Sequence, residues 1–399
     1  MSFRAKYCFA VIATVILTAC ASEKKESGQW YKGNLHTHSY WSDGDEYPEM
    51  IMDWYKTQGY NFVGLSDHNI LAEGEKWVVV AKSRMYEEGF EKYLAKYGDA
   101  WVEHIADTGR IQVKLKTYDQ YKPLFESDSF LILKSEEITS RLGDKHVHMN
   151  VTNVRTVIMP QGGETVTEIM QRNVDAVLKQ REETGVPMFP HVNHPNFFFG
   201  VSVQDMIDLH GERFFEVYNG HPLVQNYGDS LHPGTEAMWD IINLAYLKKK
   251  QPLMFGLATD DSHNYHQFGS AYSNAGRGWV MVHADSLNPG SLIRSLEAGE
   301  FYSSTGVTLR QITFENGKLD LVVTPEPGVN YVIEFIGAAT GGLQTSVLKK
   351  VTGTKADFEV TKEHLFVRAR ITSDKLKSNP FQEGEFEMAW TQPVNLSGN

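Results

Sequence analysis

The sequence predicts an α/β protein in which βα units form a parallel sheet or barrel and a small antiparallel sandwich follows. Over most of the chain, apolar runs of strand length alternate with amphipathic helical stretches, the pattern typical of βα units. From about Gly306 onward, runs such as 319–323 and 331–335 alternate with a period of two, and no helical stretch separates them. We therefore expect a first domain over residues 30–306 and a β-sandwich over residues 307–399.

Polar residues follow the apolar runs of the first domain, one run after another. Leu35 enters His36-Thr37-His38, and a helix is then predicted from Pro48 to Gly59. In the same way, residues 61–65 lead into Ser66-Asp67-His68, 130–133 into Glu136-Glu137, 186–189 into His191 and His194, 214–217 into Asn219, and 253–257 into Asp260-Asp261-Ser262-His263. Because polar residues follow five or six separate runs, we expect them to meet at one face, where barrel enzymes hold their catalytic groups. The charged insertion 72–129 is interpreted as a surface excursion, with a substrate lid as the alternative.

The first residues are predicted to be an export signal. Arg4 and Lys6 precede an apolar stretch over residues 7–17, which is shorter than the roughly 20 residues that a membrane-spanning helix needs. The sequence Leu17-Thr18-Ala19-Cys20 resembles a bacterial lipobox. Residues 1–19 would then be a lipoprotein signal peptide and residues 20–29 a linker after a lipidated Cys20, and a plain secretory signal is the alternative. We expect a lipid-anchored protein of the cell envelope, on the periplasmic side of the outer membrane if the host is a proteobacterium.

The cysteine content and the net charge limit which disulfides, metal ligands and partners are expected. The chain has two cysteines, and cleavage before Cys20 would remove Cys8, so no disulfide within the mature chain is expected. Any zinc would be held by imidazole and carboxylate groups, which suits catalytic sites better than closed structural ones. The formal net charge of −12 argues against nucleic acid as a partner, because nucleic-acid binding needs a basic face.

The residues that follow the apolar runs are of the types that bind divalent transition metals, and there are enough of them for more than one ion. The candidates are His36, His38, Asp43, His68, Glu136, Glu137, His146, His148, His191, His194, Asp261 and His263. Glu136 and Glu137 are adjacent, so only one of them can point into a site from a strand, whereas His146 and His148 share a strand face.

In their order along the chain, these motifs resemble the PHP (polymerase and histidinol phosphatase) superfamily over about residues 30–306. The resemblance rests on His36-Thr37-His38 with Ser42-Asp43-Gly44, Ser66-Asp67-His68-Asn69, a Glu before Ile138-Thr139, His194-Pro195 and Asp261-Ser262-His263. The segments Tyr31–Leu35 and Phe301–Gly306 are similar to the CehA/McbA-type branch of that superfamily. The resemblance implies a distorted seven-stranded βα (TIM-like) barrel that holds two or three divalent ions, which would be zinc, manganese or iron, at the C-terminal ends of its strands.

The resemblance also implies a division of the ligands. His36, His38 and Asp261 would bind a first ion, Glu137 would bridge it to a second ion held by His148 and His194, and Asp43, His68 and His263 would form a third site. Glu137 is preferred to Glu136 because it directly precedes Ile138-Thr139, and His148 is preferred to His146. Glu137, Asp261 and His263 would be the catalytic residues. Candidates to support the ligands or bind substrate are Asp67, Glu136, His146, His191, Asn193, Asp260, Arg141 and Arg277.

Three of these supporting residues have specific expected roles. We expect Asp260 to accept a hydrogen bond from a ligand histidine. Arg141 and Arg277 are candidate phosphate clamps, because a guanidinium group matches two phosphate oxygens, with an ordinary surface charge as the alternative. The remaining histidines, among them His221, are expected to cap helices, close turns or face solvent.

Three functions are compatible with these residues. The first is an exported phosphoesterase that attacks a small organic phosphate with a metal-bridging hydroxide. The second is a carboxylic ester, carbamate or amide hydrolase on the same metal centre, for which an apolar pocket lined by residues such as Phe197, Phe198 and Phe199 would argue. The third is a lipoprotein binding module whose metals are structural.

Overall fold

The computed structural model describes residues 28–107 and 109–396. The predicted signal peptide, the lipidated Cys20 and most of the linker after it lie outside these residues. Within the described ranges, no helix combines the length and the apolar character that a membrane crossing requires.

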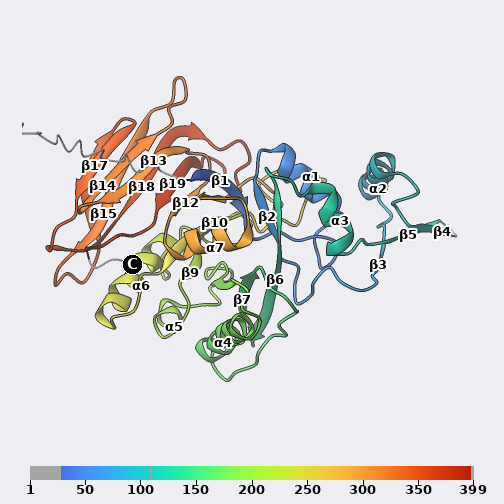
Figure 1. The fold of residues 1–399 in the computed structure, drawn as a ribbon, viewed down its shortest axis with the longest axis horizontal. Helices are drawn as coiled ribbons and strands as arrows, with labels where there is room; N and C mark the ends of the chain where they lie inside the picture. Colours follow the sequence, from blue (N-terminus) through green and yellow to red (C-terminus); the bar gives the residue numbers. More distant parts are fainter. Residues whose placement is uncertain (1–27, 108, 397–399) are drawn as a thin grey trace, which may run out of the picture.

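A 13-stranded mixed sheet runs through the molecule in the order β10-β9-β8-β7-β6-β2-β1-β11-β12-β19-β18-β15-β16 (Figure 1). Its first seven strands in this order are β10 (Phe255–Thr259), β9 (Phe214–Asn219), β8 (Phe189–Val192), β7 (Lys145–Thr152), β6 (Leu131–Leu142), β2 (Phe62–Leu65) and β1 (Gln29–Asn34). The pairs β1–β2, β2–β6, β8–β9 and β9–β10 are parallel, whereas β7 is antiparallel to both of its neighbours. A mixed α/β protein with a large sheet that contains parallel strands is thus confirmed.

The ends of this seven-stranded part approach each other without a strand ladder between them. An isolated parallel bridge joins Thr37 and Ser262, which follow β1 and β10. Asp261 N donates to His36 O (3.0 Å), and His38 N donates to Ser262 O (2.9 Å). Among the described strands no pairing closes the sheet, so a closed barrel is not confirmed. The loops that carry candidate ligands join the two ends instead.

Helices cover the outer side of these strands. They are α1 (Pro48–Thr57), α4 (Val166–Thr184), α5 (Val203–Ile207), α6 (Thr235–Lys248) and α7 (Pro289–Glu297). The predicted start of α1 at Pro48 is confirmed, and proline suits that position because its missing N–H has no partner in the first turn of a helix. Apolar residues of α4 and α6, such as Ile169 and Trp239, pack with Val192 and Phe215 in one core.

The insertion folds into a small unit at one end of the molecule (Figure 1). It contains the three-stranded sheet of β3 (Trp77–Val79), β5 (Arg110–Lys114) and β4 (His104–Asp107), together with α2 (Arg84–Tyr97) and α3 (Tyr118–Phe125). Tyr93 shares a core with Trp41 and Tyr47. Tyr93 Oη and Trp101 Nε1 each donate to Glu49 Oε1 at 2.7 Å. The insertion therefore packs against the segment that carries Asp43.

The C-terminal strands are antiparallel, as predicted. The main sheet continues through β11 (Trp279–Ala284), β12 (Phe301–Ser304), β19 (Phe386–Thr391), β18 (His364–Leu376), β15 (Tyr331–Ala339) and β16 (Ser346–Thr352). A second sheet contains β13 (Leu309–Glu315), β14 (Lys318–Val323) and β17 (Lys355–Glu359), and residues such as Leu321 and Ile333 join the two sheets in one core. Because β12 pairs with β19, a sandwich separate from the first domain is not confirmed.

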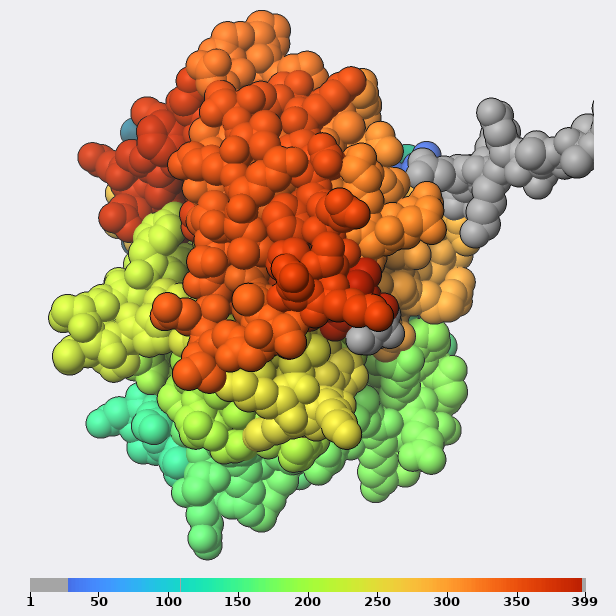
Figure 2. Space-filling view, turned by 90° about the vertical axis from the view of Figure 1, so that its left-hand side faces the viewer, coloured from blue at the N-terminus to red at the C-terminus, as the bar shows by residue number. Residues whose placement is uncertain are grey.

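Ion pairs connect the C-terminal strands to the helical layer. Arg368 of β18 is buried and donates to Asp240 Oδ1 (2.7 Å) and Glu236 Oε1 (2.8 Å), both on α6. In the space-filling view, the C-terminal strands form one broad face directly above α6 (Figure 2).

Candidate metal centre

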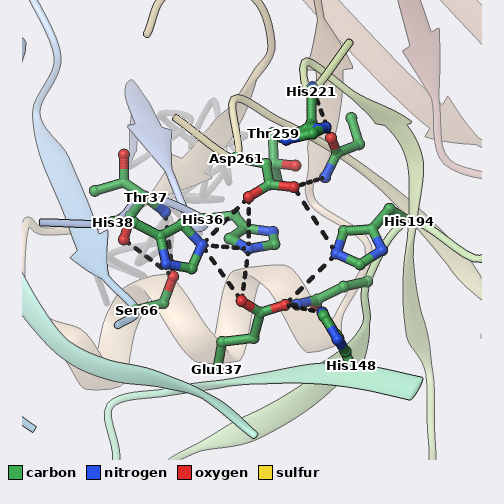
Figure 3. A network of polar contacts seen from close by, with 12 residues as sticks. His36, Thr37, His38, Ser66, Glu137, His148, His194, His221, Thr259 and Asp261 are labelled. Atoms are coloured by element: carbon green, nitrogen blue, oxygen red, sulfur yellow. Dashed lines mark hydrogen bonds and ion pairs between the residues drawn. The ribbon is translucent and has the colours of Figure 1, made fainter. Parts of the chain in front are cut away.

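The first donor group follows β1. His36 Nε2 and His38 Nε2 lie 3.1 Å apart, and each lies 3.2 Å from Asp261 Oδ1 (Figure 3). Glu137 Oε2 lies nearby, at 3.5 Å from His36 Nε2 and 3.3 Å from His38 Nε2. A tetrahedral ion with bonds of about 2.0–2.1 Å needs donor atoms about 3.3–3.4 Å apart. The donor atoms of His36, His38 and Asp261 therefore lie close enough together to hold one divalent ion.

The second donor group uses the other oxygen of the same glutamate. Glu137 Oε1 lies 3.0 Å from His148 Nδ1 and 3.5 Å from His194 Nε2. Asp261 Oδ2 lies 3.8 Å from His194 Nε2. The sets of donor atoms that lie mutually close are Glu137 with His36 and His194, and Glu137 with His68 and His148. Because Glu137 belongs to both sets, it has the geometry of a bridging carboxylate between neighbouring ions.

The third donor group is more open. Asp43 Oδ2 lies 3.4 Å from His68 Nε2, and Asp43 Oδ1 lies 3.4 Å from His263 Nε2. The Asp43 side chain is 58% exposed, whereas that of Glu137 is 0% exposed. His68 Nδ1 also lies 2.7 Å from Glu137 Oε2. The structure thus brings all nine predicted ligands together, and the third group is the one that faces solvent.

The buried carboxylates of the three donor groups make the site favourable for cations. Burial disfavours ionisation of Glu137, but the imidazoles of His68, His148 and His36 hold the pKa of this carboxyl well below its usual value. Burial likewise disfavours protonation of His36, yet the carboxylates of Asp261, Glu216 and Glu137 together raise its pKa well above the usual value. Buried carboxylates thus draw positive charge into the site, and bound cations would supply that charge while the histidines stay neutral.

Glu216 is a functional residue that the sequence analysis missed. Its Oε1 lies 2.6 Å from His36 Nδ1, and its Oε2 accepts a hydrogen bond from His194 N at 2.8 Å. Thr259 Oγ1 and Asn219 Nδ2 each donate to Glu216 at 2.8 Å. Glu216 therefore orients His36 so that Nε2 faces the first group. Its signal in the sequence is a single acid within the apolar run 214–217 of a buried strand.

Three predicted supporting residues lie next to the ligands or to the turn that carries them. Asn193 Nδ2 donates to Glu137 Oε1 at 2.8 Å and so fixes the bridging carboxylate. Asp67 accepts hydrogen bonds from Ser39 N (2.9 Å) and Ser42 Oγ (2.6 Å), which holds the turn after His38. His191 Nε2 lies 3.5 Å from Glu216 Oε1.

Other expectations need correction. Glu136 faces away from Glu137 and accepts from Ile158 N at 2.6 Å, because adjacent residues of a strand point to opposite faces. Asp260 accepts hydrogen bonds from Tyr55 Oη (2.8 Å) and from three backbone N–H groups of residues 276–278, so it holds a loop and no ligand histidine.

The two candidate phosphate clamps differ in how much of the guanidinium group the protein itself uses. Arg277 is buried and donates to carbonyl oxygens, among them Gly220 O (2.8 Å) and Tyr272 O (2.6 Å). The exposed Arg141 donates through Nε to Gly143 O at 3.1 Å in its own hairpin. Backbone carbonyls thus occupy the guanidinium group of Arg277, which excludes it as a phosphate clamp, but only the Nε–H of Arg141.

Two further histidines border the site. His146 belongs to none of the donor groups, and its ring lies 5.6 Å from that of His148. His221, expected to be an ordinary turn or surface residue, instead lies beside the site, with its ring 5.6 Å from that of His263. Burial lowers the pKa of His221 to about 4. The sequence offers no local signal for this residue, because a short loop brings it inward.

Comparisons with known proteins give only distant similarities. No family model and no curated protein matches the sequence. A two-domain protein from Bacteroides vulgatus, described as containing a predicted PHP-like metal-dependent phosphoesterase, is similar with a TM-score of 0.42 and 14% identity over 92% of this chain and 96% of that chain. A protein from Bifidobacterium adolescentis, proposed to be a metal-dependent phosphoesterase, gives a TM-score of 0.31 and 11% identity over 59% and 88% of the two chains. An amidohydrolase from Chromobacterium violaceum with bound sulfate and no metal gives a TM-score of 0.28 and 12% identity over 58% of this chain and 87% of that chain. These identities and TM-scores are too low to assign a function to this chain.

Proposed function

We propose that this protein is a metal-dependent hydrolase with two or three divalent ions, which would be zinc, manganese or iron. His36, His38 and Asp261 would hold the first ion, His148 and His194 the second, and Asp43, His68 and His263 the third. The observation that carries the proposal is the position of Glu137, whose two oxygens lie 3.3 Å from His38 Nε2 and 3.0 Å from His148 Nδ1. Such a carboxylate suits a pair of ions about 3.5–4 Å apart.

The bound ions would supply an activated water near neutral pH and would neutralise charge on substrate oxygens. The protein's own groups set the geometry. Glu216 holds His36 in one orientation, and Asn193 donates to the bridging carboxylate of Glu137. Both contacts are buried, so water does not compete for them.

We propose a small organic phosphoester as the first substrate class. A pair of ions can stabilise both the attacking and the leaving oxygen of an in-line displacement. Because the buried Arg277 donates to backbone carbonyls, the ions themselves would carry most of the charge compensation.

A carboxylic ester, carbamate or amide is the second candidate substrate. The observation that favours it is the apolar ring of Phe197, whose centroid lies 5.0 Å from that of His194. An apolar wall suits an uncharged electrophile better than it suits a phosphate dianion.

We further propose that residues 30–306 form a distorted seven-stranded barrel of the PHP superfamily, in its CehA/McbA-type branch, and that residues 307–399 form the second domain. The motif order and the bridge between Thr37 and Ser262 support this assignment. We also propose that the chain is exported and lipid-anchored through Cys20. Mass spectrometry of the protein from membranes would then show a diacylglyceryl mass that Cys20→Ser lacks.

The test of the hydrolase is a substrate panel with a matched variant. Metal-loaded wild type is assayed with p-nitrophenyl phosphate, bis(p-nitrophenyl) phosphate and p-nitrophenyl acetate, beside Glu137→Gln and Glu136→Gln. We expect turnover by the wild type and by Glu136→Gln, because Glu136 faces away from the site. Glu137→Gln is expected to lose at least about a hundredfold in kcat, since a neutral amide cannot bridge two cations. Full metal occupancy with no turnover of any substrate would instead favour the binding module.

A further inference from the structure

The loop that carries Asp43 is compact and closes on itself. It spans residues 39–46, and Tyr40 N donates to Glu46 O at 2.9 Å across its base. Gly44 packs so closely that a Cβ atom there would lie 2.6 Å from backbone atoms at the start of the loop. Because the loop is closed in this way, the residues at its two ends determine where the Asp43 carboxylate lies.

The insertion 72–129 holds the first end of this loop through Trp41. This residue is buried and lies two positions before Asp43. Its Nε1 donates to Lys116 O at 3.1 Å, and its carbonyl oxygen accepts a hydrogen bond from Lys76 Nζ. Both lysines belong to the insertion. One residue next to the ligand is therefore bound to the insertion through its side chain and through its backbone.

The insertion also holds the second end of the loop. The Tyr47 ring stacks on that of Tyr93, with centroids 4.0 Å apart and planes inclined by 10°. Two positions later, the buried Glu49 accepts hydrogen bonds from Tyr93 Oη and Trp101 Nε1, each at 2.7 Å. Bonds to a buried carboxylate are costly to lose, because the oxygen is then left unpaired away from water. Residues of the insertion thus fix both ends of the loop.

A second ligand of the third donor group is connected to the insertion through the loop after β10. The His266 ring meets that of Tyr86 on α2 edge-on, with centroids 5.6 Å apart. His266 Nε2 donates to Asp45 O at 2.8 Å, and Asp45 N donates to His263 O at 2.8 Å. The loops that carry Asp43 and His263 are therefore bound to each other, and both contact the insertion.

The first and second donor groups are held by other parts of the protein. Glu216 of β9 lies 2.6 Å from His36 Nδ1 and fixes that ring. Asn193, which follows β8, donates to Glu137 Oε1 at 2.8 Å. A change in the insertion is therefore expected to reach the third group first.

We propose that the insertion is a positioning element that sets the affinity of the third ion. The inference rests on the proposed function, because it takes Asp43, His68 and His263 as the ligands of that ion. Ligands that are held in place before an ion arrives bind it more tightly, since less freedom is lost on binding. The insertion acts on the site through the loop that it holds, and needs no contact with substrate to do so.

The test removes one indole hydrogen bond at a time. Trp41→Phe and Trp101→Phe each lose a bond that joins the insertion to the Asp43 loop or to the start of α1. Trp77→Phe is the matched control, because its indole donates to an exposed carboxylate within the insertion. The zinc-loaded full chain is titrated with a competing chelator, and native mass spectrometry counts the ions that remain. Thermal unfolding checks that each variant is folded.

We expect the third ion to leave Trp41→Phe and Trp101→Phe at chelator concentrations about tenfold lower than those the wild type needs. The other two ions should keep their affinity, and Trp77→Phe should match the wild type. This difference between ions separates positioning from a general loss of stability, which would weaken all three.

An unchanged third ion in both variants, or an equal loss of all three ions, overturns the inference. A wild type that binds only two ions when zinc is in excess overturns it as well. The proposed function fails separately: three bound ions without turnover of any substrate would refute hydrolysis and leave the positioning role of the insertion.

Discussion

The buried and the exposed parts of the metal centre differ in how firmly the protein fixes their ligands. His36 and Glu137 are 0% exposed, and Glu216 and Asn193 hold them in place. Asp43 is 58% exposed, and among the described residues its carboxylate is paired only with the histidines around it. Groups whose orientation is fixed before the ion arrives lose less freedom on binding. We therefore expect two firmly held ions and a third that exchanges readily.

Removal of the metal ions should give the largest of the expected changes, a loss of thermal stability. Buried carboxylates that face one another without cations destabilise the fold, whereas ions that bind only the folded state stabilise it by about 2.7 kcal/mol at a concentration a hundred times the Kd. Thermal unfolding with and without a chelator should show a fall in Tm of several degrees that added metal reverses. An unchanged Tm would mean that the buried groups do not bind ions.

Loss of the Glu216 charge should give the next largest effect. Glu216→Gln keeps the size of the side chain but weakens its contact with His36 Nδ1, now 2.6 Å. Metal affinity should fall about 10- to 100-fold, as measured by competition with a chromogenic chelator. Glu212→Gln is the control, because Glu212 is equally buried and accepts hydrogen bonds from Arg213 N and Phe214 N, away from the donor groups. Equal affinities of the two variants would contradict the positioning role.

Loss of the Asp43 carboxylate should give the smallest effect. Asp43→Asn removes one charged donor from the third group and touches neither oxygen of Glu137. Native mass spectrometry should show loss of at most one ion, with the other two retained. Loss of all ions in Asp43→Asn would show that the three groups bind as one unit, and the contrast between buried and exposed groups would fail.

Most of the ligands could be predicted because they follow an apolar run, where a strand passes into a loop, whereas Glu137 and His148 lie within β6 and β7. Strand alternation showed that only one of Glu136 and Glu137 could face the site, and the motif order selected Glu137. The contacts of Glu216 could not be predicted, because its partners His36 and His194 come from segments far away in the sequence.

The remaining errors have the same cause. The sequence predicts that Asp260 supports a ligand histidine, but its partners, such as Tyr55, depend on how α1 packs. The pairing of β12 with β19 joins residues more than 80 positions apart, as in the register of Tyr302 with Thr391. Local patterns define such strands but not the neighbours they pair with.

The central claim is that Glu137 is shared by two ions. Elemental analysis of purified wild type and Glu137→Ala, prepared side by side, tests it most directly. We predict two to three metal equivalents in the wild type and a loss of more than one equivalent in the variant. Equal metal content in the two proteins, or the absence of metal from the wild type after loading, would contradict it.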